Sequence, residues 1–167
     1  TPHHISLTDE YMQSFDTLGK VAPPLRTEED RQALIEGLKD GTIDILATDH
    51  APHTYNKKET SMDLAAYGMI GLASAFGLYM TELVHKDELS LIDLVKKITI
   101  NPAKIINIDL PGFEIGEKAE FTIFDTDEWW VFNEKNIYSK SHNTPFIGHE
   151  LNGRVKKVII GNKVIEI

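Results

Sequence analysis

Residues 43–53, IDILATDHAPH, indicate the class of fold. The run up to Thr48 is short, rich in β-branched residues and almost wholly apolar, which is expected of a parallel strand covered on both faces. It ends at Asp49, and His50 and His53 follow closely. In parallel α/β folds the loops after the strands display the active groups. We therefore expect a strand over residues 42–48 with candidate functional side chains directly after it.

A helix is predicted immediately before this strand. Thr27 is a good N-cap, Asp30 stands three residues later as in a capping box, and Gly41 is a suitable residue to end the helix. A helix, a tight turn and a buried strand in succession are typical of α/β proteins. We further expect the end of a strand within residues 1–7, and helices over residues 64–84, 91–98 and 101–106.

The pattern changes near residues 110–116. From Gly112 onward the chain shows short β-rich runs separated by glycine-containing turns, and Gly161-Asn162 is a hairpin signal. The sequence thus predicts an α/β unit over residues 1–110 and a β unit over residues 111–167.

Composition excludes several classes of function. The 167 residues are 41% hydrophobic and 26% charged, as in soluble globular proteins. The net charge of -9 without a lysine- or arginine-rich run argues against a nucleic-acid partner. The absence of cysteine excludes disulfides and thiolate metal sites and fits a cytoplasmic protein. The most apolar stretch, residues 64–80, falls short of the roughly 20 apolar residues that span a membrane. Because the first residue is threonine, we expect a longer parent protein.

Asp49 is the residue to which the sequence most directly assigns chemistry. A carboxylate at a strand end can bind a divalent metal, or can take a proton from a water whose pKa the metal has lowered. His53 follows Pro52 and can turn back toward a substrate, whereas His50 is expected to point away from Asp49. The alternative is that Asp49 caps the next segment and both histidines lie on a surface loop. Spacing alone leaves the two interpretations open.

His3-His4 suggests zinc, because histidine is a common ligand of that metal. Neighbours on a strand point to opposite faces, so at most one of them can serve a given site, and a structural role is the simpler interpretation. We assign no role to His85, His142 and His149, which lie at helix ends or in loops. We expect Trp129-Trp130 to pack in the β unit rather than to form a stacking platform. One aspartate and a loop histidine are too few for a hydrolytic zinc site, which needs three or more protein ligands.

Several motifs together resemble one family. GTIDILATDHAPH resembles the last-strand motif of dihydroorotases, which are cyclic amidohydrolases of the metal-dependent amidohydrolase superfamily. The similarity covers essentially the whole chain, and the further matching segments occur in the order of the family. They are TPHHISLTDE, PPLRTEEDRQALIEGLKDG, YGMIGLASAF, LSLIDLVKKITINPAKI, GFEIGEKAEFTIFD and SKSHNTPFIGHELNGRVKKVIIGNKV.

The resemblance implies a fold and an activity. The fold is a (β/α)8 TIM-like barrel joined to a small β-sandwich, of which this chain would supply the last two barrel strands and the C-terminal sandwich strands. The activity is the reversible hydrolysis of the cyclic amide of dihydroorotate to carbamoyl aspartate in pyrimidine biosynthesis. One or two zinc ions would serve it, most of their ligands lying in a missing N-terminal part of the barrel. A homodimer and aspartate carbamoyltransferase are the implied protein partners.

The resemblance also implies roles for single residues. Asp49 would be a zinc ligand and the general base, His53 would hold the substrate near its carboxylate, and the backbone at Tyr67 and Gly68 would line its ring. Ala22 stands where the family has an asparagine that contacts substrate. Tyr67 replaces a phenylalanine and Ala73 a glutamate, while His3-His4 matches none of the family's zinc-binding histidines.

Three hypotheses remain at this point. The chain is the C-terminal segment of a dihydroorotase, inactive alone; or it is a non-catalytic dihydroorotase-like partner of a carbamoyltransferase; or it is a relative of hydantoinases and allantoinases. A part of a closed barrel should also expose apolar faces and strand edges, and should self-associate or pair with the rest.

Overall fold

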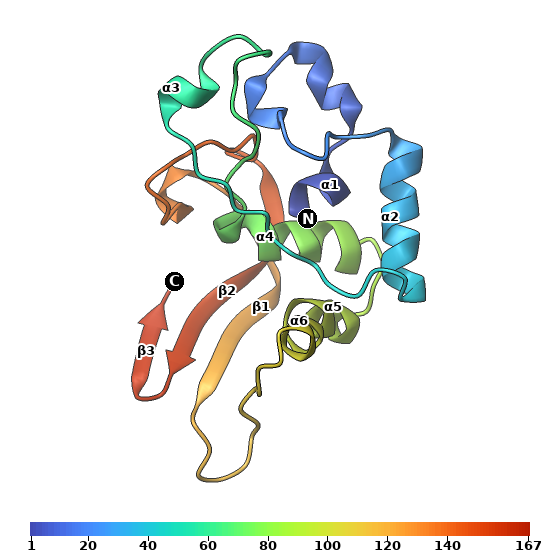
Figure 1. Ribbon diagram of the computed structural model, residues 1–167. Helices are drawn as coiled ribbons and strands as arrows, with labels where there is room; N and C mark the ends of the chain where they lie inside the picture. Colours follow the sequence, from blue (N-terminus) through green and yellow to red (C-terminus); the bar gives the residue numbers. More distant parts are fainter.

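The computed structural model describes residues 1–167 as a group of short helices from which a twisted antiparallel sheet extends (Figure 1). Three short 3-10 helices lie at Asp9–Ser14, Thr17–Gly19 and Glu134–Asn136. The helices are α1 (Pro2–Ser6), α2 (Glu28–Asp40), α3 (Tyr55–Lys58), α4 (Leu72–Tyr79), α5 (Leu91–Ile98) and α6 (Ile100–Ile105). The strands are β1 (Glu120–Val131), β2 (Glu150–Ile160) and β3 (Lys163–Glu166). None of the helices combines the length and the apolar character needed to span a membrane.

The predicted start and end of α2 are confirmed. The Thr27 hydroxyl accepts the backbone N–H of Asp30, and the Asp30 carboxylate accepts the backbone N–H of Thr27, each at 3.3 Å. Gly41 follows the helix with φ of 86°, a left-handed conformation that glycine adopts without steric cost. Ile35 and Leu38 form the buried face of α2.

The prediction of a strand over residues 42–48 is wrong. The segment is extended but joins no ladder, and only an isolated parallel bridge between His50 and Met69 follows it. Its backbone N–H and carbonyl groups instead form hydrogen bonds with the backbone of α5 and with two side chains. The Leu46 N–H donates to the carbonyl of Lys97 at 3.0 Å, the Lys97 ammonium donates to the carbonyl of Ile43 at 2.6 Å, and the Tyr79 hydroxyl donates to the carbonyl of Ala47 at 2.9 Å. An apolar run without a neighbouring strand cannot form a sheet.

Two further expectations near the helices differ from the structure. Residues 2–6 form α1 rather than the end of a strand, with a proline in the first turn, where its fixed φ suits a helix. The helix expected from residue 64 begins only at Leu72, because Gly68 has φ of 113° and Met69 takes part in the parallel bridge. The helices at 91–98 and 100–105 match the predictions closely.

The C-terminal strands form one three-stranded sheet in the order β1-β2-β3. The predicted hairpin at Gly161-Asn162 is confirmed, since β2 and β3 pair antiparallel from Ile160 and Lys163 outward. No second sheet packs on this one, so a β-sandwich is not seen. The outer edges of β1 and β3 are unpaired.

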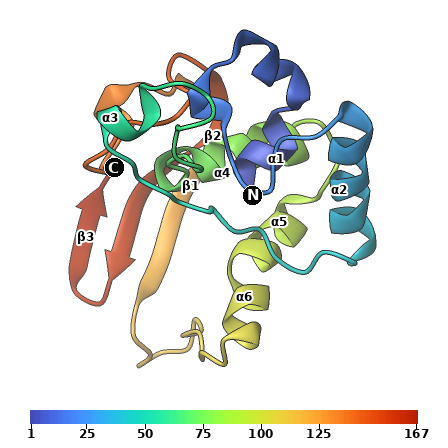
Figure 2. The ribbon, with the colours of Figure 1, turned by 45° about the horizontal axis from the view of Figure 1, so that its top comes forward.

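Helix α4 occupies the centre of the molecule (Figure 2) and contributes residues to each of two apolar clusters. One cluster joins α1, α2 and α5 to Ala75 and Tyr79 of α4. The other joins Leu78 of α4 to Leu151 of β2. The expectation of exposed apolar surface is also confirmed, most clearly around the connection from α6 to β1, where Ile105, Ile106, Ile108, Phe113 and Ile115 are exposed.

Candidate active site

Asp49 ends the extended segment in an unusual backbone conformation. Its φ is 47°, in the left-handed region that residues other than glycine rarely adopt, and its side chain is about half exposed (47%). The carboxylate lies beside a cleft of about 830 Å³ whose lining includes His4, Ala22, Pro23 and Ala47. The structure therefore brings Asp49 and Ala22 to one cleft, as the sequence interpretation requires.

His3 is the nearest titratable neighbour of this carboxylate. Its Nε2 lies 3.7 Å from Oδ2 of Asp49, its side chain is fully buried, and neither ring nitrogen has a hydrogen-bond partner. Burial lowers the pKa of His3 to about 3, with a smaller contribution from His4, so the ring is neutral near pH 7. The pair is thus a neutral imidazole beside a carboxylate rather than an ion pair. The sequence interpretation missed this neighbour, because it placed His3 on a strand.

His53 contacts the backbone beside Gly68, away from the Asp49 cleft. The His53 Nε2 lies 2.8 Å from the carbonyl oxygen of Tyr67, and a Cβ built on Gly68 would lie only 2.5 Å from the Cβ of Ala51. His53 lines a separate cleft of about 550 Å³ and is not among the residues around the Asp49 cleft. Asp49 and His53 thus line two different clefts.

Lys58 is a buried cation in this second region that sequence reasoning did not select. Its exposed fraction is 2%, and its ammonium group donates to the carbonyls of Ala66 and Gly68 at 3.0 Å each and to that of Lys20 at 3.4 Å. Burial lowers its pKa from the usual value to about 8. Lys58 therefore fixes the backbone on both sides of Tyr67. No local motif in the sequence indicates that Lys58 is buried, because one of its partners, Lys20, lies 38 residues away.

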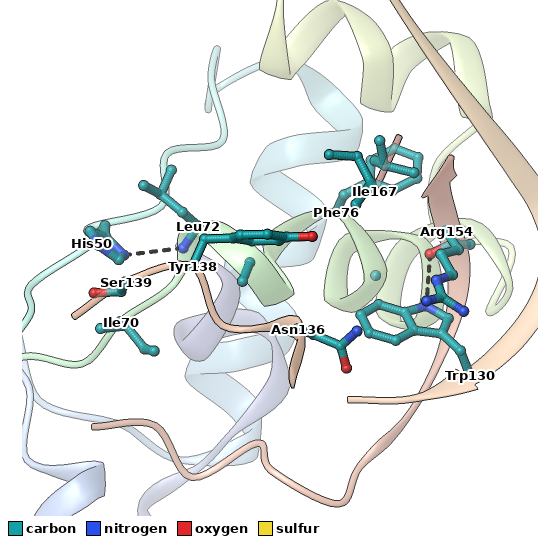
Figure 3. A pocket seen from close by; sticks show the side chains of 14 residues that line it. His50, Ile70, Leu72, Phe76, Trp130, Asn136, Tyr138, Ser139, Arg154 and Ile167 are labelled. Atoms are coloured by element: carbon teal, nitrogen blue, oxygen red, sulfur yellow. Dashed lines mark hydrogen bonds between the residues drawn. The ribbon is translucent and has the colours of Figure 1, made fainter. Parts of the chain in front are cut away.

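His50 serves the start of α4. Its Nδ1 accepts the backbone N–H groups of Gly71 and Leu72 at 3.1 and 3.3 Å, which otherwise lack partners at a helix N-terminus. Figure 3 shows His50 at one end of a cavity of about 450 Å³, with Trp130 and Arg154 of the sheet at the other. Ala73 lines the same cavity. His50 and Ala73, the alanine in place of the family's glutamate, thus line a different cavity from the cleft beside Asp49.

The residues of this chain do not by themselves hold a zinc ion. No group of three or more histidine, cysteine, aspartate or glutamate side chains is close enough together to bind a metal. Asp49 offers one ligand, and the unpartnered nitrogens of His3 are buried behind it. A zinc site needs at least three protein ligands, and Asp49 alone does not supply them.

Known proteins match nearly all of this chain. The Amidohydrolase family model matches residues 4–165. A dihydroorotase of Acetivibrio thermocellus is 46% identical over 164 residues, which are 98% of this chain and 38% of that protein. A dihydroorotase of Clostridium acetobutylicum is 45% identical over 165 residues, 99% of this chain and 39% of that protein. The chain therefore spans less than two fifths of the length of these relatives.

Solved structures agree with the family. An L-hydantoinase (dihydropyrimidinase) of Arthrobacter aurescens superposes with a TM-score of 0.88 at 28% identity, covering 99% of this chain and 38% of that one. The inactive dihydroorotase-like domain of a Chaetomium thermophilum CAD-like multifunctional protein superposes with a TM-score of 0.67, covering 97% of this chain and 41% of that one, and at 20% identity it bears on the fold alone. The chain thus has the fold of a part of these proteins, and it belongs to the amidohydrolase family.

Proposed function

We propose that this chain is part of a dihydroorotase, which hydrolyses the cyclic amide of dihydroorotate reversibly to carbamoyl aspartate in pyrimidine biosynthesis, in the cytoplasm. The observation that carries the proposal is the identity of 46% with a dihydroorotase along 98% of the chain. The position of Asp49 beside a cleft shared with Ala22 supports it. Both units proposed from the sequence, residues 1–110 and 111–167, belong to that enzyme.

The Asp49 carboxylate has two roles in this proposal. It would be one ligand of a zinc site whose other ligands lie outside these residues, and it would accept a proton from the attacking water. When bound, zinc would supply Lewis-acid chemistry, which polarises an amide carbonyl and lowers the pKa of water. A carboxylate that is half exposed at the edge of a cleft is accessible for both roles.

The remaining candidate residues bind substrate. The imidazole of His53 holds the substrate near its carboxylate, and the backbone at Tyr67 and Gly68 lines the ring. The contact of His53 with the Tyr67 carbonyl supports a common role for these residues. Ala22 lies on the Asp49 cleft with a side chain that offers no hydrogen bond, so contacts there are apolar.

The 167 residues alone should be inactive, because zinc has too few ligands here. The exposed apolar side chains and the free edges of β1 and β3 support pairing with a further part of the barrel and sandwich. A homodimer or a complex with aspartate carbamoyltransferase is a further proposed assembly.

The test is a chimaeric enzyme in which this chain replaces the matching segment of the Acetivibrio thermocellus dihydroorotase. We expect the chimaera to bind zinc and to hydrolyse dihydroorotate. The 167 residues alone, with zinc added, should show no enzyme-like turnover. A folded chimaera that binds zinc but leaves dihydroorotate intact would contradict the proposal. Enzyme-like turnover by the isolated chain would contradict the claim that further ligands are needed.

Two alternatives are separated by the same chimaera. The match to an L-hydantoinase structure favours a hydantoinase or allantoinase relative, which would turn over another cyclic amide faster than dihydroorotate. Ala22, Tyr67 and Ala73 favour a non-catalytic assembly partner, since they depart from the residues expected of the enzyme. Such a partner would bind a carbamoyltransferase equally well after Asp49→Ala.

A further inference from the structure

We infer that Asn143 is a positioning residue that holds the backbone around His53 and the backbone around Gly68 in a fixed relation. The inference rests on the proposed function, because it assigns Asn143 to the substrate-binding part of that site. Asn143 lies in the connection between β1 and β2, far along the chain from the residues that it contacts.

The side chain of Asn143 uses both kinds of hydrogen-bonding group. Its Oδ1 accepts the backbone N–H of His53 at 3.0 Å, and its Nδ2 donates to the carbonyls of Ala51 at 3.0 Å and Gly68 at 3.3 Å. Its own backbone carbonyl accepts the N–H of Ile70 at 3.0 Å. With an exposed fraction of 6%, Asn143 is shielded from water that could replace these bonds.

The two segments lie outside helices and strands, and few bonds join them directly. The Ala51 N–H donates to the Met69 carbonyl at 2.9 Å and the His53 Nε2 lies 2.8 Å from the Tyr67 carbonyl, while Lys58 holds the Gly68 carbonyl from a third segment. The amide of Asn143 therefore supplies contacts that a strand ladder supplies elsewhere. Its bonds to His53 and Gly68 join residues 90 and 75 positions apart in the chain.

An amide is the group that this position requires. Aspartate keeps an acceptor for the His53 N–H but loses both donors, and it places a negative charge beside the carbonyls of Ala51 and Gly68. Alanine or leucine leaves the His53 N–H and the Ala51 carbonyl without their partner, and leaves the Gly68 carbonyl with Lys58 alone. A buried polar group without a partner costs free energy, so the segments should move apart to reach water.

The consequence for His53 is a fixed ring. Its backbone N–H is held by Asn143, and its Nε2 lies 2.8 Å from the Tyr67 carbonyl. A carbonyl oxygen only accepts, so Nε2 carries the proton in that contact, and Nδ1 is the ring nitrogen left for a ligand. Asn143 thereby acts on the substrate through His53 and Gly68 rather than by touching it.

Amide hydrogen exchange of the 167-residue chain tests the contact directly. In Asn143→Ala we expect the His53 amide to exchange about tenfold faster or more, as expected for the loss of a buried hydrogen bond, while an amide within α2, such as that of Leu38, is unchanged. Asn152→Ala is the matched control, because Asn152 is equally buried and its side chain has no hydrogen-bond partner. It should leave the His53 amide unaffected.

Asn143→Asp gives a second measurement should the alanine variant fail to fold. It should keep the His53 amide slow and shift the carbonyl ¹³C resonances of Ala51 and Gly68, which both lose the Asn143 donor. Equal acceleration at His53 and Leu38 in Asn143→Ala, or unmoved carbonyl resonances in Asn143→Asp, would overturn the inference. Either result would mean that Asn143 contributes only to overall stability or makes no such contacts.

The link to substrate binding is measured in the chimaeric enzyme. We expect Asn143→Ala to raise the KM for dihydroorotate about tenfold with a much smaller change in kcat, since binding groups rather than reacting groups are displaced. An unchanged KM alongside faster His53 exchange would overturn the assignment to substrate binding. A chimaera without activity before any substitution would contradict the proposed function instead, and the exchange result would still decide whether Asn143 holds the two segments.

Discussion

The Nε2 of His3 lies 3.7 Å from the Oδ2 of Asp49, so a fully buried imidazole without any hydrogen-bond partner stands beside the candidate catalytic carboxylate. The distance is longer than a hydrogen bond, and a small movement of the half-exposed Asp49 side chain would close it. Because the His3 ring is neutral near pH 7, it can donate to the carboxylate without cancelling its charge. His3 therefore offers a neutral hydrogen-bond donor close to the Asp49 carboxylate at the edge of the cleft.

Asp49→Asn should abolish most of the activity of the chimaeric enzyme while leaving its fold intact. Asparagine tolerates the left-handed conformation at φ of 47°, so the backbone is retained and only the charge is lost. We expect the rate of dihydroorotate hydrolysis to fall about 10²- to 10⁴-fold, the usual contribution of a general base. Steady-state kinetics and zinc content measure the effect, and an unchanged melting temperature is the control. Full activity in this variant would favour the non-catalytic alternative.

Gly68→Ala should destabilise the chain more than Gly41→Ala does. Both glycines have positive φ, 113° and 86°, but a Cβ at Gly68 would lie 2.5 Å from the Cβ of Ala51, whereas one at Gly41 meets open space. The Gly41 variant reports backbone strain alone, about 1 kcal/mol. We expect a further loss of about 1–3 kcal/mol at Gly68 from the clash. Urea denaturation compares the two, and equal losses would argue against the close packing of Gly68 on Ala51.

The stability of the chain should rise between about pH 8 and pH 10.5 through Lys58. Burial lowers the pKa of Lys58 to about 8 in the folded state, against 10.5 for an ordinary lysine, so in this range the unfolded chain binds the additional proton. Stability rises with pH wherever the unfolded state binds more protons. Urea denaturation at pH 8 and pH 10 measures the rise. Lys58→Met, which removes the titrating group, should show a smaller rise over the same range; an identical rise would exclude Lys58 as its source.

Asn152→Leu should stabilise the chain, in contrast to Asn143→Leu. Both asparagines are buried, but neither polar side-chain atom of Asn152 has a hydrogen-bond partner, whereas the Asn143 amide makes three hydrogen bonds. Removing an unsatisfied buried amide should raise the free energy of unfolding by about 1 kcal/mol, and removing a satisfied one should lower it by more. The midpoints of urea denaturation give both values. A loss of stability in Asn152→Leu would show that its amide is satisfied by water.

Local signals in the sequence predicted the elements that depend on neighbouring residues. The capping box at Thr27, the helix end at Gly41 and the hairpin at Gly161-Asn162 each follow from a few adjacent side chains. The strand expected over residues 42–48 is absent because strand formation requires a partner, and the segment instead contacts Lys97 and Tyr79 from distant helices.

The candidate site was predictable only in part for the same reason. The motif around Asp49 and His53 is visible in the sequence, but the residues that surround it are not. His3, Lys58 and Asn143 reach the site through contacts between residues 38 to 90 positions apart, and none of them carries a distinctive local pattern. The separation of Asp49 and His53 into two hollows likewise follows from packing rather than from spacing.

The central position of α4 has a consequence for engineering this family. Ala75 and Tyr79 of α4 pack with α1, α2 and α5, while Leu78 packs with Leu151 of the sheet. A crossover point placed between the helices and β1 would therefore pair a sheet from one parent with a helix surface from another. Recombined amidohydrolases should keep α4 and β2 from the same parent, even though 70 residues separate them in the chain.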